Sequence, residues 1–298
     1  MSDADQEAIG PYSRSVEQVF RRFAALQVRR ARTITMLDSA GLQRRRLQGV
    51  NLPSWVPDWT AQNTSPKVIS TLRPVPYSAS GSAQTHIQLV GDAIGTGGLS
   101  VRGLLVETID TVAHVHSAPR TSRNGEPDFL VFHEKFRAAF DGLVRQGRSV
   151  YINNEEAFGR LLLMDDMYTG RNAILYSSPI DDPAATYRGA LAAWREGRGY
   201  QAGMGSGKMN AVQTYQMQAG TATLGRGFAT TQTGYIGLVP PSAQVGDLVV
   251  VIFGATVPYV VRRVQAGYLL VGDAFVHGLM YGEALQKRGL QPKDIVLI

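Results

Sequence analysis

Short apolar runs separated by turns dominate the last part of the chain. From Arg226 the sequence reads "FATTQTGYIGLVP", "GDLVVVIFG", "VPYVVRRV" and "GYLLVGDAFVHG", with glycine-containing turns between these runs. Short strands rich in β-branched and aromatic residues, joined by tight turns, are typical of compact antiparallel sheets. The pattern predicts an antiparallel β-barrel or strongly curled sheet over residues 226–280, inside a β-rich part that covers about 225–298.

A helix is predicted from Ser15 to about Leu37. Ser15 and Gln18 have the spacing of a capping box, and Gly41 suits the end of the helix. Its apolar residues recur at helical spacing and form one stripe, which is expected to pack against the C-terminal sheet. The stripe consists of Val16, Val19, Phe20, Phe23 and Leu26.

The middle of the chain mixes strands and helices. Strand patterns occupy residues 85–115, and "LSVRGLLVETIDTVAHV" is the longer of the two. Apolar spacing predicts further helices over residues 128–146, 154–164, 184–195 and 213–219. We therefore expect a single α+β domain over residues 1–298. Its helical and mixed part covers about 11–220, and helices pack the C-terminal sheet.

The segment "LPSWVPDWT" places two prolines and two tryptophans close together. Proline disfavours a helix here and predicts an extended backbone. Because such a segment has few other means of stabilisation, we expect Trp55 and Trp59 to be mostly buried in a core.

Charge is concentrated near the N-terminus. The chain has a formal net charge of +6, and residues 14–46 hold nine arginines against Glu17 and Asp38, which gives +7 for that stretch. The arginines are not interleaved with aromatic residues, as nucleic-acid binding would favour. Nucleic acid is therefore an unlikely partner, and a solvated helix face or an acidic partner remains open.

Other sequence features exclude several classes of protein. The chain has no cysteine, which excludes disulfides and thiolate chemistry. No apolar run is long enough to span a membrane, and the polar N-terminus is not a signal peptide. We expect a cytoplasmic protein.

The stretch "QAGMGSGKMN", residues 201–210, resembles a phosphate-binding loop. Ala202 stands where the loop needs its first glycine, and Met209 stands where it needs Ser or Thr. No Rossmann fingerprint and no nucleophile elbow are present. The pairs Asp165–Asp166 and His114–His116 lack evident further metal ligands. We therefore predict no metal and no cofactor.

His277 lies in "GDAFVHGLMYGEAL", close in sequence to Asp273 and Tyr281. A neutral imidazole beside a carboxylate is a common acid–base or hydrogen-bonding pair. A histidine that is satisfied structurally at a corner of the sheet is the alternative.

Several stretches of the chain resemble fungal heterokaryon-incompatibility (HET) proteins. They include "PYSRSVEQVFRRFA", "LPSWVPDWT", "YSASG", "LSVRGLLVETID", "EAFGRLLLMDD" and most of the C-terminal β-rich part. The likeness begins at about residue 11. The matching part of those proteins is the region that follows the HET domain, and the HET domain itself carries the signalling and cell-death activity in that family. The resemblance implies the C-terminal region of such a protein, lacking the HET domain itself.

Two hypotheses about function follow. The main one is a cofactor-independent cyclase or isomerase of fungal secondary metabolism, a pericyclase that catalyses an intramolecular Diels–Alder-type ring closure. It would hold an apolar, carbonyl-bearing small-molecule substrate in a shaped pocket. His277 and Tyr235 would donate hydrogen bonds to the carbonyl, with Asp273 as the third catalytic candidate. Trp55, Asp58 and Trp59 are the substrate-binding candidates.

The alternative is a non-catalytic HET-type binding or regulatory module. Such a module would contact its partner through the arginine-rich helix. The sequence does not give the substrate or the oligomeric state.

Overall fold

The computed structural model describes residues 15–42, 51–60, 68, 77–91, 97–113, 129–165, 182–196 and 211–298. Our predictions for the loop 201–210, for His114 and His116, and for Asp166 lie outside these residues. That residues 1–298 form a single domain stays a prediction.

The described strands form one nine-stranded sheet that is almost entirely antiparallel. The strands are β1 Ile87–Val90, β2 Gly98–Ala113, β3 Gly227–Thr231, β4 Ile236–Val239, β5 Leu248–Ile252, β6 Tyr259–Val264, β7 Gly267–Asp273, β8 Phe275–Val276 and β9 Lys293–Leu297.

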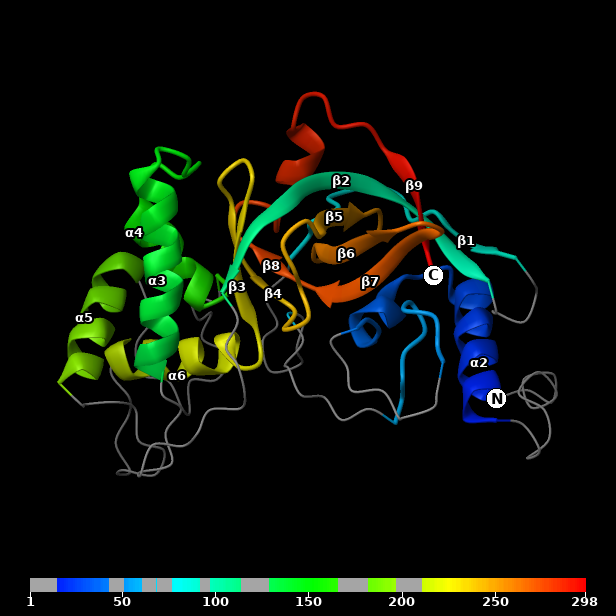
Figure 1. The fold of residues 1–298 in the computed structure, drawn as a ribbon, viewed down its shortest axis with the longest axis horizontal. Helices are drawn as coiled ribbons and strands as arrows, with labels where there is room; N and C mark the ends of the chain where they lie inside the picture. Colours follow the sequence, from blue (N-terminus) through cyan, green and yellow to red (C-terminus); the bar gives the residue numbers. More distant parts are fainter. Residues whose placement is uncertain are drawn as a thin grey trace.

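Five of these strands close into a ring, with β2 as its longest member (Figure 1). β2 pairs with β9 on one side and with β5 on the other, and β6 and β7 continue from β5. The ring closes through the parallel pair Tyr268 and Leu297, which joins β7 to β9. The predicted α+β fold with a C-terminal barrel or curled sheet is confirmed.

β2 belongs to two parts of the sheet because its register shifts twice. One shift lies between Leu105 and Glu107, and the other between Ile109 and Thr111. Bulges of this kind bend a strand and increase its twist. From Ile109 onward, β2 leaves the ring and pairs with β3, which β4 and β8 extend.

The described helices lie on two sides of the sheet (Figure 1). α3 to α6 gather beside β3 and β4, and α2 stands beside β1 at the other end of the molecule. The helices are α2 Val16–Ala31, α3 Phe129–Arg145, α4 Asn154–Leu162, α5 Pro183–Arg195 and α6 Ala211–Thr223, with 3-10 turns at Thr35–Ser39 and Glu283–Gln286.

Aromatic side chains connect the layer of α3 to α6 with the sheet. Phe136 on α3 stacks on Phe228 of β3 with ring centroids 5.2 Å apart. Phe140 stacks on Phe158 of α4 at 5.4 Å. All four rings are buried in one cluster that also contains Phe275. The cluster fixes the helices against the open half of the sheet.

α2 begins where the sequence predicted and ends earlier. The Ser15 side chain accepts a hydrogen bond from Gln18 N, and Ala24 and Val28 are buried in the barrel core. α2 therefore packs on the barrel as predicted, but the predicted stripe as a whole does not form the contact: Phe20 packs against this core, whereas Val16 is 45% exposed. The predicted end at about Leu37 is wrong, because Arg32 adopts a left-handed conformation with φ of 46°. A residue in that conformation ends a helix.

The two tryptophans of "LPSWVPDWT" differ in burial. Trp55 is fully buried in the barrel core, as predicted, and its Nε1 donates to the Gly97 carbonyl at 3.4 Å. Trp59 is 43% exposed, so the prediction of burial is wrong for this residue. Its indole packs edge-on against Phe20 and Phe23 of α2, at 5.0 and 5.1 Å. The outer surface of a helix replaces the core as its packing partner.

Candidate functional site

Asp273, a candidate catalytic residue, lies in a buried ion pair at the end of β7. Arg226 NH2 contacts Asp273 Oδ1 and Oδ2 at 3.2 and 3.1 Å, and NH1 donates to the Asp273 carbonyl at 2.9 Å. The side chains of Arg226 and Asp273 are 0% and 1% exposed. Val68 N also donates to Oδ2, at 2.6 Å. The carboxylate therefore joins three segments of the chain.

His277 and Tyr235 both contact Tyr151, a residue that the sequence did not single out. The Tyr151 hydroxyl donates to the His277 carbonyl at 2.8 Å and accepts from Ile236 N at 3.0 Å. The Tyr151 ring lies 5.1 Å from the imidazole and 6.3 Å from the Tyr235 ring. Burial raises the pKa of Tyr151 well above its ordinary value. Tyr151 is thus a neutral hydrogen-bonding group between β4 and the turn after β8.

A charged pair lies beside Tyr235. Lys287 Nζ lies 4.4 Å from the centre of the Tyr235 ring and 2.5 Å from Glu107 Oε1. Glu107 comes from β2 and its side chain is 2% exposed. Its Oε2 has no hydrogen-bond partner among the described residues. The ammonium therefore interacts with both a π-face and a carboxylate.

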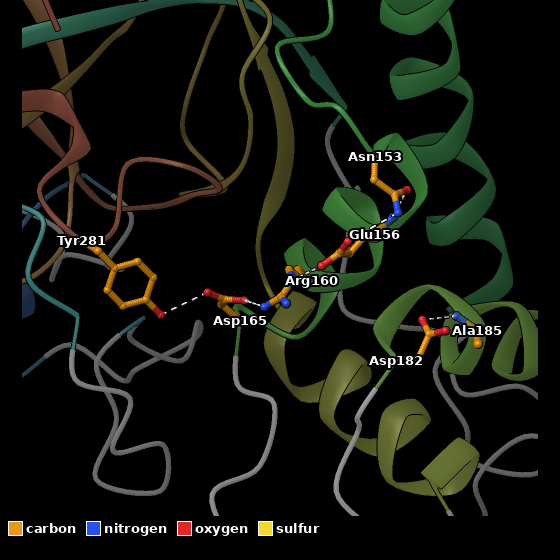
Figure 2. Close-up of polar contacts among 7 residues, drawn as sticks. All are labelled: Asn153, Glu156, Arg160, Asp165, Asp182, Ala185 and Tyr281. Atoms are coloured by element: carbon orange, nitrogen blue, oxygen red, sulfur yellow. Dashed lines mark hydrogen bonds and ion pairs between the residues drawn. The ribbon is translucent and has the colours of Figure 1, made fainter. Parts of the chain in front are cut away.

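A chain of ionic contacts leads from α4 to Tyr281 (Figure 2). Arg160 binds Glu156 Oε1 at 2.9 Å and Asp165 Oδ1 at 2.8 Å, and the Tyr281 hydroxyl donates to Asp165 Oδ2 at 3.1 Å. Met164 and Asp165 have φ of 50° and 56°. Two successive left-handed residues other than glycine cost free energy, which the contacts of Asp165 offset.

The same charges determine the protonation of His277. Burial lowers its pKa from the ordinary value, the Asp165 carboxylate opposes this shift, and the Arg160 guanidinium reinforces it. The imidazole is therefore neutral near pH 7. The sequence suggested Asp273 as its carboxylate neighbour, but the largest carboxylate influence on its pKa comes from Asp165, 112 residues earlier in the chain.

The substrate-binding candidates lie in a different part of the molecule. Trp55 belongs to the barrel core, and Asp58 Oδ1 accepts from Thr60 N and Thr60 Oγ1 at 2.9 and 2.6 Å. None of the described contacts joins this segment to Tyr235 or His277. The structure therefore brings together Tyr235 and His277 through Tyr151, and it does not bring the tryptophans to them.

A groove lies between the C-terminal end of α2 and β1. It has a volume of about 640 Å³. We call it the α2–β1 groove, and it is lined by Val28, Arg29, Arg32, Thr85, His86, Ile87, Gln88, Leu89 and Gly91. Arg29, Arg32 and His86 are exposed, and the described residues that line the groove include no carboxylate.

A second cavity, of about 390 Å³, lies between α3 and α5. His133 Nε2 and the Tyr187 hydroxyl are 2.6 Å apart, and Arg137 binds Asp141 at 2.8 Å. Burial and the positive charge of Arg137 lower the pKa of His133 to about 4. The lining also contains the charged residues Glu134, Glu155 and Arg195.

The described residues show no group of three or more histidine, aspartate and glutamate side chains that could hold a metal ion. Across the same part of the chain, no helix is long and apolar enough to cross a membrane.

Comparisons with known proteins agree with this architecture. The Het-6 beta-barrel domain matches residues 181–297, which include β3 to β9. The chain is similar to heterokaryon incompatibility protein 6, OR allele, of Neurospora crassa. The two are 26% identical over 329 aligned positions, which cover 94% of this chain and 47% of that protein. The chain thus spans about half the length of this curated relative. No solved structure matches the chain. The resemblance to HET proteins that the sequence indicated is confirmed.

Proposed function

We propose that this chain acts in the cytoplasm as a non-catalytic binding and regulatory module of the HET type. The observation that carries the proposal is the α2–β1 groove, where Arg29 and Arg32 line an exposed hollow. A positive surface of this kind attracts an acidic partner and speeds its association. The similarity to a heterokaryon incompatibility protein supports a role in such a system.

The cyclase hypothesis needs an apolar cavity beside hydrogen-bond donors. Both cavities described above are lined by charged side chains, and neither contains Tyr235 or His277. Asp273 and the Tyr151 hydroxyl are engaged in internal hydrogen bonds. These observations favour a binding module over the enzyme.

The experiment compares two variants with the same change of charge. Arg29→Glu with Arg32→Glu alters the groove, and Arg145→Glu with Arg188→Glu alters exposed arginines of α3 and α5 as a control. The tagged full chain is cross-linked in fungal cells, and the attached proteins are identified by mass spectrometry. We expect a protein that the wild type and the control retain and the groove variant loses.

The competing hypothesis is tested in parallel by deletion of the gene and metabolite profiling. An uncyclised precursor that accumulates in the deletion strain, and that purified protein then converts, would overturn the proposal. Equal retention of every protein by all three forms would also contradict it.

A further inference from the structure

The inference in this section rests on the proposed function and concerns the chemistry of the partner. We propose that the α2–β1 groove binds an extended acidic segment of another protein, which adds to β1 as a further strand and places its carboxylates against Arg29 and Arg32.

Among the described strands, β1 lies at an edge of the sheet. It pairs with β2 alone among the described strands, with Ile87 opposite Val101 and Leu89 opposite Leu99. The His86 carbonyl accepts from Arg102 N at 3.1 Å. Hydrogen bonding alternates along an antiparallel pair. The N–H and C=O groups of Ile87 and Leu89 therefore point away from β2, towards the free edge.

This edge lacks the usual features that prevent pairing with other chains. Natural edge strands carry lysine, proline, a bulge or an inward-pointing charge. The sequence of β1 is Ile-Gln-Leu-Val, which has no charge and no proline, and its register with β2 has no shift. Ile87 and Leu89 pack towards the barrel core, and Val90 is 42% exposed. β1 is 4 residues long, so the added strand is short.

Charge selects which strand can pair. Arg29 lies in the last turn of α2 and Arg32 directly follows the helix, and both line the hollow next to the edge. They lie at the C-terminal end of α2, where the helix dipole repels anions. An acidic segment must therefore be held by the guanidinium groups rather than by the helix backbone.

A protein segment explains these features better than nucleic acid does. Phosphates would pair with the arginines but would leave the outward N–H and C=O groups of β1 unmatched. No tryptophan, tyrosine or phenylalanine is among the described residues that line the groove, so the large rings that stack on bases are missing there. An extended acidic peptide satisfies both the backbone groups and the arginines.

The probe is a short fluorescein-labelled peptide that alternates glutamate with valine, titrated into the full chain and followed by fluorescence anisotropy. We expect saturable binding that weakens as salt rises from about 50 to 500 mM, because screening reduces the attraction of exposed charges. The Arg29→Glu, Arg32→Glu variant should lose at least about tenfold in affinity. The Arg145→Glu, Arg188→Glu variant should bind as the wild type does, and a lysine-for-glutamate peptide should not bind.

Strand addition is tested by two isomers of the peptide, N-methylated at the valines or at the glutamates. Only one set of N–H groups faces β1 in an added strand, so one isomer should lose binding and the other should keep it. Equal binding of both isomers would overturn strand addition and leave the proposed function intact. Binding of a single-stranded oligonucleotide in place of the peptide would overturn the choice of partner. Peptide binding unchanged in the groove variant would overturn the site itself.

Discussion

Arg226 and Arg32 belong to the same chain and the same residue type, but their surroundings differ completely. Arg226 is buried. Its guanidinium group binds both the side-chain carboxylate and the backbone carbonyl of Asp273. Arg32 ends α2 in a left-handed conformation and lines an exposed groove with Arg29. In one region the charged side chain is buried and paired within the fold, and in the other the charged side chains lie at the exposed surface.

The difference shows how burial determines what an ionic group can do. A buried charge must be paired, because its removal from water costs several kcal/mol. It therefore stabilises one arrangement of the chain and is not available to a ligand. An exposed arginine contributes little to folding, and so the chain can use it for recognition. Asp273 is a structural residue by this criterion, and the α2–β1 groove is the better candidate for function.

The largest expected effect is on the buried region. Asp273→Ala should reduce the free energy of unfolding by about 3–5 kcal/mol, because the Arg226 guanidinium is left buried without its carboxylate. Val68 N would lose its acceptor in the same variant. Urea unfolding at pH 7, followed by circular dichroism, measures the loss.

Two controls sharpen that comparison. Asp294→Ala removes a carboxylate from an exposed pair with Arg102, whose side chains are 59% and 44% exposed, and should cost less than about 1 kcal/mol. Arg226→Met combined with Asp273→Leu removes both buried charges and should cost less than Asp273→Ala alone. A loss below about 1 kcal/mol for Asp273→Ala would show that the pair is not structural.

The second effect is a dependence of stability on pH. The pKa of His133 is about 4 in the folded chain and about 6.5 when unfolded. The unfolded chain therefore takes up a proton first as the pH falls, and stability is lost between about pH 6.5 and 4. Arg137 and Arg195 favour the neutral imidazole, and Asp141 opposes them. The contribution is about 3 kcal/mol at most.

His133→Phe tests this assignment because it removes the titrating group and keeps an aromatic ring. The change in unfolding free energy between pH 7.5 and 4.5 should be smaller in the variant than in the wild type by about 2–3 kcal/mol. His277, whose pKa is also lowered, contributes in the same direction in both proteins. Identical pH dependence in the two proteins would assign the effect to other groups.

The sequence predicted the regular parts of the fold better than the site. Alternation and turns located the C-terminal sheet, and helical spacing located α2, because both depend on local periodicity. The ring contains a register shift in β2 between Leu105 and Glu107 and closes through one pair between β7 and β9, and no local pattern encodes either feature. Trp59 was placed wrongly because a Pro-flanked indole can pack on a helix surface as well as in a core.

The site needed contacts between residues far apart in the chain. Tyr151 and His277 are 126 residues apart, and Lys287 and Glu107 are 180 residues apart. The one local signal near Tyr151 is Asn153, which caps α4 by accepting from Glu156 N. That signal marks the start of a helix and gives no indication of His277. The arginines of α2 were visible in the sequence, but the strand edge beside them was not.

A third, smaller effect concerns the hydrogen bonds of Tyr151. Tyr151→Phe removes the donor to the His277 carbonyl and the acceptor of Ile236 N, and should cost about 2 kcal/mol. Tyr235→Phe removes a hydroxyl of a half-buried ring and keeps the contact with Lys287, so it serves as the matched control and should cost less. Equal losses in urea unfolding for the two variants would contradict the central role of Tyr151.

The smallest expected effect on the free energy of unfolding comes from the variant of the α2–β1 groove. The same variant should have the largest effect on binding. Arg29→Glu with Arg32→Glu should change the free energy of unfolding by less than about 1 kcal/mol, because both side chains are exposed. A small loss is expected, since negative charge at a helix C-terminus opposes the dipole. Thermal unfolding at low and high salt separates that loss, which salt should reduce, from damage to packing, which salt should not. A loss of 3 kcal/mol or more would place these arginines in the same class as Arg226, and the contrast between a structural and a recognition arginine would then fail.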